Sequence, residues 1–500
     1  MVGRAFARGI SIYAVAAVVS RLVSFAAQIV LGRLLSDREF GIFAAAFGVV
    51  AVTGCLRSGG VQHYLQALPS ERFDRDAGPY VWLATIAAAV GGVATLMAAV
   101  AVGWFDRPPA MRLVLVVLAG WVFLNAISLI YRARMQSEMR VLSLAVTEVV
   151  GMLLRSVLGI VLALFGAGAM AIALPMTITS LFETVVFGSQ ARMRREHWRA
   201  TRAELRAAWH TVRWTLLFAV CAVVVFQGDY FAASFFLSDE SLGNYYFAFS
   251  LCNQPTYVVV GTFTAFIAPV VSRLGDSRDR QASAVLRLAR AMGVLVPVIA
   301  FVVPALLPEL DHLVWAGKWH VVNATAVPLT LAICLMSSTA LLYGATNGIG
   351  AFRLAAIIET ARAVAVFVGA GLGAWWFGSP FGVASMLCIV AGGISVIGSS
   401  VILRLFGANP WRAALSVLVG PCVVAVAVGG LRLGLNRVSG WSGADDEHRW
   451  RYAIELVAAG VAYTAVVVLV ARVCFRTTVR EAIALLPDRV SRLAQYLVGR

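Results

Sequence analysis

Apolar stretches of about 20 residues or more recur from one end of this chain to the other. A helix of that length crosses the hydrocarbon core of a bilayer, whereas the alternating stretches of about ten residues that form transmembrane barrels do not occur. Only 13% of the 500 residues are charged, against roughly a quarter in soluble domains. The sequence therefore predicts an all-α polytopic membrane protein with about fourteen transmembrane helices.

The apolar windows predict where these helices lie. The first seven span residues 9–31, 40–60, 79–105, 112–131, 140–165, 167–190 and 211–236. The other seven span residues 243–272, 291–310, 323–347, 353–377, 381–405, 413–431 and 452–474. The connections are short, so the sequence leaves no soluble domain large enough to hold an active site of its own.

The basic residues test this helix count. Most of the 41 lysines and arginines fall in alternate loops when the N-terminus is placed inside, as the positive-inside rule requires. We therefore predict a multi-pass protein of the bacterial cytoplasmic (inner) membrane with both termini in the cytoplasm. The arginines sit between apolar runs and form no long basic surface with stacking aromatics, so the net charge of +16 does not indicate nucleic-acid binding.

A repeat organises the chain. Leu35–Phe47 aligns without gaps to Leu237–Phe249, with six of thirteen residues identical. Six predicted helices separate the copies, which indicates two parallel halves related by an axis along the membrane normal. The predicted parts are an N-terminal six-helix lobe at 1–190, a basic cytoplasmic connector at 191–213, a C-terminal six-helix lobe at 214–406, two additional transmembrane helices at 407–475, and a cytoplasmic amphipathic tail at 476–500.

Motifs of catalysis and metal binding are missing from the sequence. There is no HExxH, CxxC, GxSxG or P-loop pattern, and the six histidines are scattered. We expect no enzyme activity, no metal and no cofactor, although a coupling ion, H⁺ or Na⁺, stays open.

Charged residues inside membrane helices are the best functional pointers here, because each costs about 2.5 to 3.5 kcal/mol to insert and usually faces a polar path or a partner. Arg21, Ser24 and Gln28 are spaced to share one helical face, which we expect to point inward. Arg57 lies near a predicted cytoplasmic end, where substrate contact and snorkelling to the surface are both open.

Two pairs of opposite charge occur further along. Glu148 and Arg155 share a face, while Glu359 and Arg362 are close enough to form an internal ion pair, which explains them as well as a substrate site does. The predicted substrate-binding set is Arg21, Gln28, Arg57, Arg155 and Arg362.

Buried carboxylates suggest ion coupling. Asp229 and Glu183 each stand within a predicted helix, where a carboxylate is either a proton or cation relay or the partner of a basic residue. The predicted ion-coupling set is Asp229, Glu148, Glu183 and Glu359.

Several segments resemble a known family. Gly32–Phe43 is similar to the loop after the first helix of Wzx-type polysaccharide flippases, where an "ARxLGPxxYG" pattern is common. The second copy at Leu237–Phe249, Ala268–Leu274 and Ala316–Trp319 match in the same order. The family belongs to the multidrug/oligosaccharidyl-lipid/polysaccharide exporter superfamily. Where the pattern has "LGP", this chain has Leu35–Asp37, and no motif identifies the sugar.

The resemblance implies a transporter with two lobes that alternate access. Its cargo would be an undecaprenyl-diphosphate-linked oligosaccharide moved from the inner to the outer leaflet, with Arg21 as the leading contact for the diphosphate. The expected partners are the lipid-linked oligosaccharide, membrane lipids and polysaccharide assembly proteins. The alternatives are a cation-coupled drug exporter, a lipid II flippase of the same superfamily, and a membrane polysaccharide polymerase or ligase.

Overall fold

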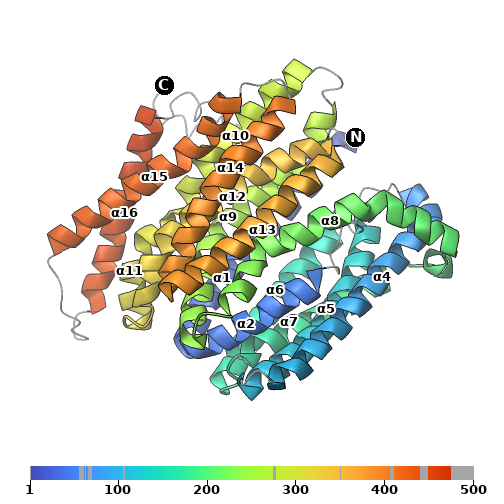
Figure 1. Ribbon diagram of the computed structural model, residues 1–500, viewed down its shortest axis with the longest axis horizontal. Coiled ribbons are helices and arrows are strands. Elements are labelled where there is room, and N and C mark those ends of the chain that lie inside the picture. The colour runs from blue at the N-terminus through green and yellow to red at the C-terminus, as the bar shows by residue number, and fades with distance from the viewer. Residues whose placement is uncertain are drawn as a thin grey trace. The chain divides into compact units, whose positions relative to one another are not determined.

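The fold consists of long α-helices joined by short turns (Figure 1). The computed structural model describes residues 2–55, 61, 64–65, 70–104, 107–138, 140–273, 278–348, 351–405, 410–439 and 449–474. No strand occurs among these residues, which confirms the predicted all-α class.

The helices follow the predicted segments. In the first half they are α1 (Val2–Leu34), α2 (Asp37–Thr53), α4 (Ser70–Ala101), α5 (Pro109–Ser137), α6 (Val141–Leu164), α7 (Met170–Gln190) and α8 (Arg202–Ala233). In the second half they are α9 (Asp239–Arg273), α10 (Arg278–Ala300), α11 (Val302–Trp315), α12 (His320–Gly348), α13 (Phe352–Phe377), α14 (Pro380–Leu405), α15 (Pro410–Ser439) and α16 (Arg449–Cys474). Short 3₁₀ turns lie at Val102–Trp104 (η2) and Arg195–Trp198 (η3).

Each predicted segment falls on one helix, except residues 291–310, which fall on α10 and α11 around a break at Phe301. The predicted segment 40–60 is too long, because α2 ends at Thr53 and is capped at Gly54. By length and hydropathy, eleven stretches of the described residues are able to cross a membrane, and α10 and α11 together form one of them. The remaining predicted crossings fall on α1, α2 and α9. The predicted tail at 476–500 lies outside the described residues.

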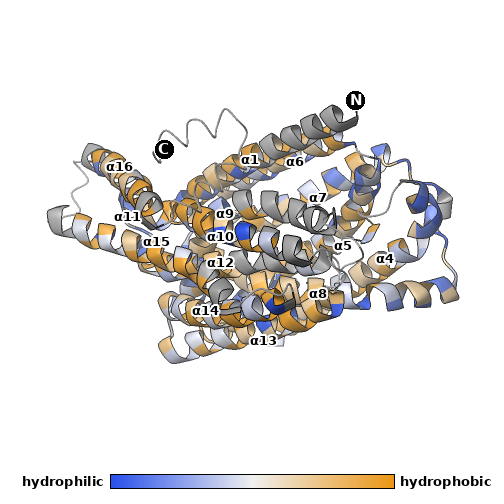
Figure 2. Ribbon diagram, turned by 90° about the horizontal axis from the view of Figure 1, so that it is seen from above, coloured by the Kyte–Doolittle hydropathy of each residue, from blue (hydrophilic) through white to orange (hydrophobic). Residues whose placement is uncertain are grey.

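Hydrophobic residues cover the helices along most of their length, and hydrophilic residues gather toward helix ends (Figure 2). Many large apolar side chains point outward, including Met97, Ile389 and Val426 at 68%, 70% and 75% exposure. Water would penalise so much exposed apolar surface, whereas lipid tails do not. The fold is that of a protein surrounded by a bilayer.

The helices pack into two compact units. Unit 1 comprises Met1–Tyr246 and Phe352–Trp375, and unit 2 comprises Phe247–Ala351 and Trp376–Arg500. The chain passes from one unit to the other within α9 and within α13. The lobe boundaries drawn from the sequence repeat stay a prediction.

In unit 1, α1 lies along α6, α5 packs between α4 and α7, and α2 packs on α8. In unit 2, α12 packs on α14, and α15 lies against α10 and α14. The Arg432 guanidinium of α15 forms an ion pair with Glu309 of α11, and the Tyr463 hydroxyl of α16 donates to the Val298 carbonyl. These contacts attach the two C-terminal helices to the rest of unit 2.

Candidate functional site

The polar face predicted on the first helix lies on α1. Arg21, Ser24 and Gln28 are all half-buried, and α1 packs against α6 over much of its length. Positions spaced by three and four residues fall on one side of a helix, so this face forms a continuous polar strip. The strip brings a guanidinium next to the helix that carries Arg155.

Arg155 of α6 is half-buried in the same part of unit 1. It interacts electrostatically with Arg21 of α1, Glu183 of α7 and Tyr246 of α9. Among the described residues, no carboxylate forms an ion pair with Arg155. Glu183 interacts in turn with the Arg132 guanidinium of α5 and the Glu148 carboxylate of α6. Helices α1, α5, α6, α7 and α9 therefore each contribute a charged or phenolic side chain to this part of unit 1.

A glycine makes room for the carboxylate. A β-carbon on Gly151 of α6 would lie 3.2 Å from Oε1 of Glu183, so the acid of α7 reaches the backbone of α6 one turn before Arg155. Any larger residue at this position would push Glu183 away, because the contact is tighter than ordinary van der Waals contact. Gly151 thus fixes where the negative charge of this group lies.

Glu148 has a partner that the sequence pattern did not reveal. Its carboxylate forms an ion pair with the guanidinium of Arg132 on α5. The predicted helix at 112–131 ends one residue before Arg132, whereas α5 continues to Ser137. A helix predicted from hydropathy stops too early when its last turn is polar, because that turn lowers the mean hydropathy.

Glu359 and Arg362 pair with each other on α13. Arg362 Nη1 lies 3.3 Å from Glu359 Oε2, and each side chain is only 2% exposed. The guanidinium also lies over the ring of Phe226, 6.0 Å from its centroid. Of the two interpretations open from the sequence, this geometry favours the internal ion pair.

Asp229 is 2% exposed near the end of α8. Its carboxylate accepts hydrogen bonds from the Tyr245 hydroxyl at 2.5 Å and from the Tyr230 backbone N–H at 3.0 Å. No arginine or lysine forms an ion pair with it within the described part of the chain. The buried acid is held by neutral donors, and its contacts tie α8 to α9.

The predicted site residues are thus only partly brought together. Arg21, Gln28, Arg155 and Glu183 lie on packed helices of unit 1, and Glu183 also interacts with the Glu148–Arg132 pair. Glu359 with Arg362, and Asp229, form separate groups. Arg57 lies outside the described residues. No group of three histidines, cysteines or acids suited to a metal ion occurs in the described ranges.

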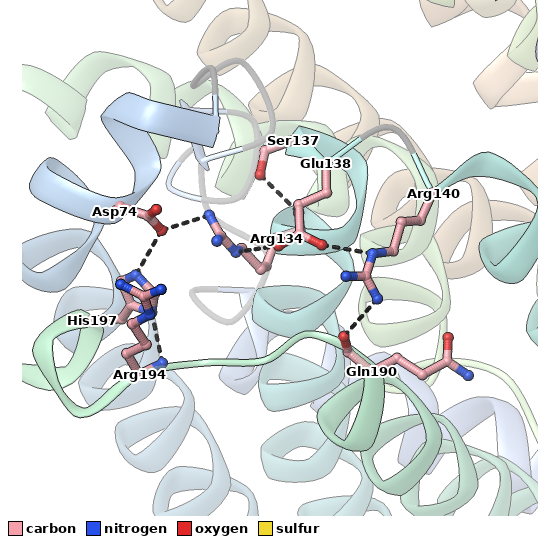
Figure 3. A network of polar contacts seen from close by, with 8 residues as sticks. All are labelled: Asp74, Arg134, Ser137, Glu138, Arg140, Gln190, Arg194 and His197. Atoms are coloured by element: carbon pink, nitrogen blue, oxygen red, sulfur yellow. Dashed lines mark hydrogen bonds and ion pairs between the residues drawn. The ribbon is translucent and has the colours of Figure 1, made fainter. Parts of the chain in front are cut away.

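A second cluster of arginines, which the sequence did not indicate, lies at the ends of several helices (Figure 3). Arg134 of α5 contacts Asp74 of α4 at 2.8 Å and Glu138 at 3.0 Å. Glu138 also contacts Arg140 at 2.7 Å, and Arg140 donates to the backbone carbonyl of Gln190 at the end of α7. Carboxylates and carbonyls alternate with guanidiniums throughout this network.

The basic connector is anchored to the same network (Figure 3). His197 of η3 is buried; its Nε2 lies 3.0 Å from Asp74, and its Nδ1 accepts the Arg194 backbone N–H at 2.9 Å. Since Nδ1 accepts a hydrogen bond, Nε2 carries the proton donated to Asp74. All the joined segments are predicted to lie on one side of the membrane, so the packing agrees with the predicted alternation of loops.

Comparison with protein families gives one match across more than half of the chain. Residues 30–324 match the model of a family described as "Polysaccharide biosynthesis protein". Among curated protein sequences, none matches.

Solved structures share the fold. The lipid II flippase MurJ in an inward closed conformation superimposes with a TM-score of 0.65 at 12% identity, covering 92% of this chain and 98% of MurJ. The Vibrio cholerae MATE transporter VcmN gives 0.50 at 14% identity, covering 82% and 99%. An inward-facing multidrug resistance MATE family transporter of the MOP superfamily gives 0.50 at 13% identity, covering 82% and 96%. This chain therefore shares the fold of these flippase and transporter structures.

Proposed function

Because this chain belongs to the family of polysaccharide biosynthesis proteins, we propose that it flips an undecaprenyl-diphosphate-linked oligosaccharide, the repeat unit of a polysaccharide, between membrane leaflets. The direction is from the inner to the outer leaflet of the bacterial cytoplasmic membrane, with both termini in the cytoplasm. The likeness of the fold to a lipid II flippase supports a large lipid-linked cargo. Polysaccharide assembly proteins are the expected partners.

One observation carries the proposal: Arg155 lies half-buried beside Arg21, with no carboxylate of the described residues paired to it. A cation at membrane depth is costly unless it serves an anion. Two neighbouring guanidiniums suit a diphosphate, because each presents a planar fork of donors to phosphate oxygens. The polyprenyl tail remains in lipid, and Gln28 on the same face of α1 offers amide groups to the sugar.

We assign ion coupling to acids that form no ion pair with an arginine or lysine of the described residues. Glu148 and Glu359 are neutralised by Arg132 and Arg362, so their charges are structural. Asp229 is held by Tyr245, and Glu183 interacts with Arg132, Glu148 and Arg155 without forming an ion pair among the described residues. We therefore assign H⁺ coupling to Asp229 or Glu183, whose charge can change without breaking an ion pair.

The test is export in a strain that lacks the gene. Loss of the protein should leave lipid-linked oligosaccharide on the cytoplasmic leaflet and remove the surface polymer. Arg21→Ala and Arg155→Gln should fail to restore export while inserting normally, and Arg21→Lys should restore part of it. Arg112→Gln is the matched control, because Arg112 is an exposed arginine at the start of α5.

Two other cargoes are separated by the same strain. Accumulation of lipid II would favour a lipid II flippase, the function named for the superimposed MurJ structure. Unchanged polymer with new sensitivity to cationic drugs would favour a drug exporter, as named for the superimposed MATE transporters. Either result would overturn the oligosaccharide proposal.

A further inference from the structure

The two copies of the repeated segment cross each other through glycine. A β-carbon on Gly41 of α2 would overlap the carbonyl oxygen of Asp239 in α9, and one on Gly243 of α9 would overlap the carbonyl oxygen of Asp37 in α2. The same β-carbon on Gly243 would lie 2.8 Å from the Gly41 nitrogen. Neither helix tolerates even a methyl group here, so the backbones touch directly.

The contact is reciprocal in the repeat itself. Gly41 and Gly243 are the seventh residues of the aligned copies, and Asp37 and Asp239 are the third. The seventh residue of each copy therefore meets the third residue of the other, as a local two-fold axis requires. Close backbone approach at glycine, with Cα–H groups facing carbonyl oxygens, is a common way for membrane helices to cross.

The crossing lies where both helices begin. Ser36 caps α2 in a capping box with Glu39, and the Ser238 hydroxyl accepts the Ser241 backbone N–H at the start of α9. These helix starts follow loops that are predicted to face outward. The crossing is therefore at the predicted outer end of the bundle.

The arginine site lies just inside the crossing. Tyr246 follows Gly243 by less than one turn and interacts electrostatically with Arg155. Its ring packs edge-on against Phe43 of α2 and Tyr230 of α8, with centroids 5.4 Å apart in both cases. The crossing and Arg155 are thus linked through one residue, Tyr246.

The end of α8 and the start of α9, from Asp229 to Tyr246, form one structural piece that we call the α8–α9 corner. The hydrogen bond from Tyr245 to Asp229 joins the two helices. Its contact with α2 is again through glycine, because a β-carbon on Gly48 would lie 2.6 Å from the Phe231 nitrogen. Glycine contacts of this kind are weak individually, so this corner is able to separate from α2 without breaking ion pairs between them.

Arg107 also binds the α8–α9 corner, from the segment between α4 and α5. Arg107, between α4 and α5, donates to the Ser234 carbonyl at 2.5 Å, and its guanidinium lies 3.6 Å from Asp239. Both partners belong to the α8–α9 corner. Arg107 therefore holds the corner in the arrangement in which Gly41 and Gly243 touch.

We propose that the Gly41–Gly243 crossing is the outer gate of the transport path, held shut by Arg107 and opened when the α8–α9 corner leaves α2. The gate rests on the proposed function for its direction and its purpose. Its residues are not those that would bind the cargo.

Thiol accessibility tests the gate without any cargo. In a chain whose seven native cysteines are replaced by serine, Tyr246→Cys would report on the space beside Arg155, with a membrane-impermeant maleimide added outside intact cells. Arg107→Gln should raise the labelling rate about two- to fivefold, the shift expected from losing one weak, partly exposed ion pair. Gly41→Ala and Gly243→Ala should each raise it further, because the added methyl group overlaps the facing backbone and forces the two helices apart.

Matched controls change the same residue types elsewhere. A β-carbon on Gly393 of α14 meets nothing within 4 Å, and Arg112 is exposed, so Gly393→Ala and Arg112→Gln should leave the labelling rate unchanged. Equal labelling in all five variants would overturn the gate. Arg107→Gln keeps this outcome decisive if the glycine variants do not fold, because it creates no clash.

The experiments distinguish an error in the gate proposal from an error in the proposed function. Raised labelling in a protein that moves no lipid-linked oligosaccharide would leave the gate intact and remove the proposed function. Normal export, with a labelling rate that does not change on substitution of Gly41, Gly243 or Arg107, would overturn the gate and leave the proposed function intact.

Discussion

Arginines occur in two different settings within unit 1. In the network of α4, α5, α6 and the connector, Arg134 and Arg140 each contact a carboxylate, and Glu138 joins them (Figure 3). Between α1, α6 and α7, Arg155 interacts electrostatically with Arg21 and Glu183. In the first setting each guanidinium has a carboxylate partner, whereas in the second Arg155 forms no ion pair with a carboxylate of the described residues.

The difference separates scaffold from binding site. A buried guanidinium with a fitted carboxylate has its desolvation offset within the protein, and it can hold helices together but has little to offer a ligand. A guanidinium without such a partner keeps its donors for an incoming anion. The predictions below ask whether this distinction holds, starting with the largest expected effect.

Arg155→Ala should reduce the initial rate of export by about 100-fold, since charge-assisted hydrogen bonds to phosphate contribute roughly 1.5 to 3 kcal/mol each. Thermal stability should not fall, because the substitution removes a cation that no carboxylate neutralises. The measurement is the appearance of lipid-linked oligosaccharide in the outer leaflet. Undiminished export would show that the two settings do not differ in function.

Arg134→Ala should act on stability instead of transport. It removes the guanidinium that both Asp74 and Glu138 contact, although Glu138 keeps Arg140. We expect a loss of about 1 to 3 kcal/mol, discounted because the Asp74 side chain is 40% exposed. A thermal melt of the purified protein measures it. Export per folded molecule should stay near that of the wild type, and a specific loss of export would contradict a scaffolding role.

Variants of the Glu359–Arg362 pair test whether these two buried charges serve mainly to neutralise each other. Either Glu359→Gln or Arg362→Met alone leaves one buried charge unpaired, whereas the double variant removes both. We expect the double variant to be more stable than each single variant by about 1 to 3 kcal/mol. If Arg362 binds the cargo instead, the double variant will melt normally and fail to export.

His197→Gln should give the smallest effect. Glutamine keeps one donor for Asp74 but loses the ring that packs edge-on against Phe73, with centroids 5.9 Å apart. The expected cost is about 0.5 to 1.5 kcal/mol, typical of one hydrogen bond. Faster proteolysis of the connector would report the loosening, and unchanged cleavage would indicate that Trp198, whose carbonyl accepts the Trp82 indole N–H, anchors the connector alone.

Helix positions were predictable because a lipid-exposed backbone must satisfy its own hydrogen bonds, so length and hydropathy alone mark each crossing. Within the described ranges, the windows missed the break between α10 and α11 at Phe301. The face carrying Arg21, Ser24 and Gln28 followed from helical spacing within a single element. Helical spacing also allowed Glu359 to pair with Arg362, but the sequence left a substrate site equally open, and only the structure brings the two side chains together.

Partnerships between helices did not follow from the sequence. Glu148 with Arg132, Asp229 with Tyr245, and Tyr246 with Arg155 each join residues on different elements. The sequence determined that Gly41 and Gly243 are equivalent, yet only the packed structure decided that each meets the other's helix start. Spacing along one helix is set by its geometry, whereas which helices touch depends on the packing of every side chain between them.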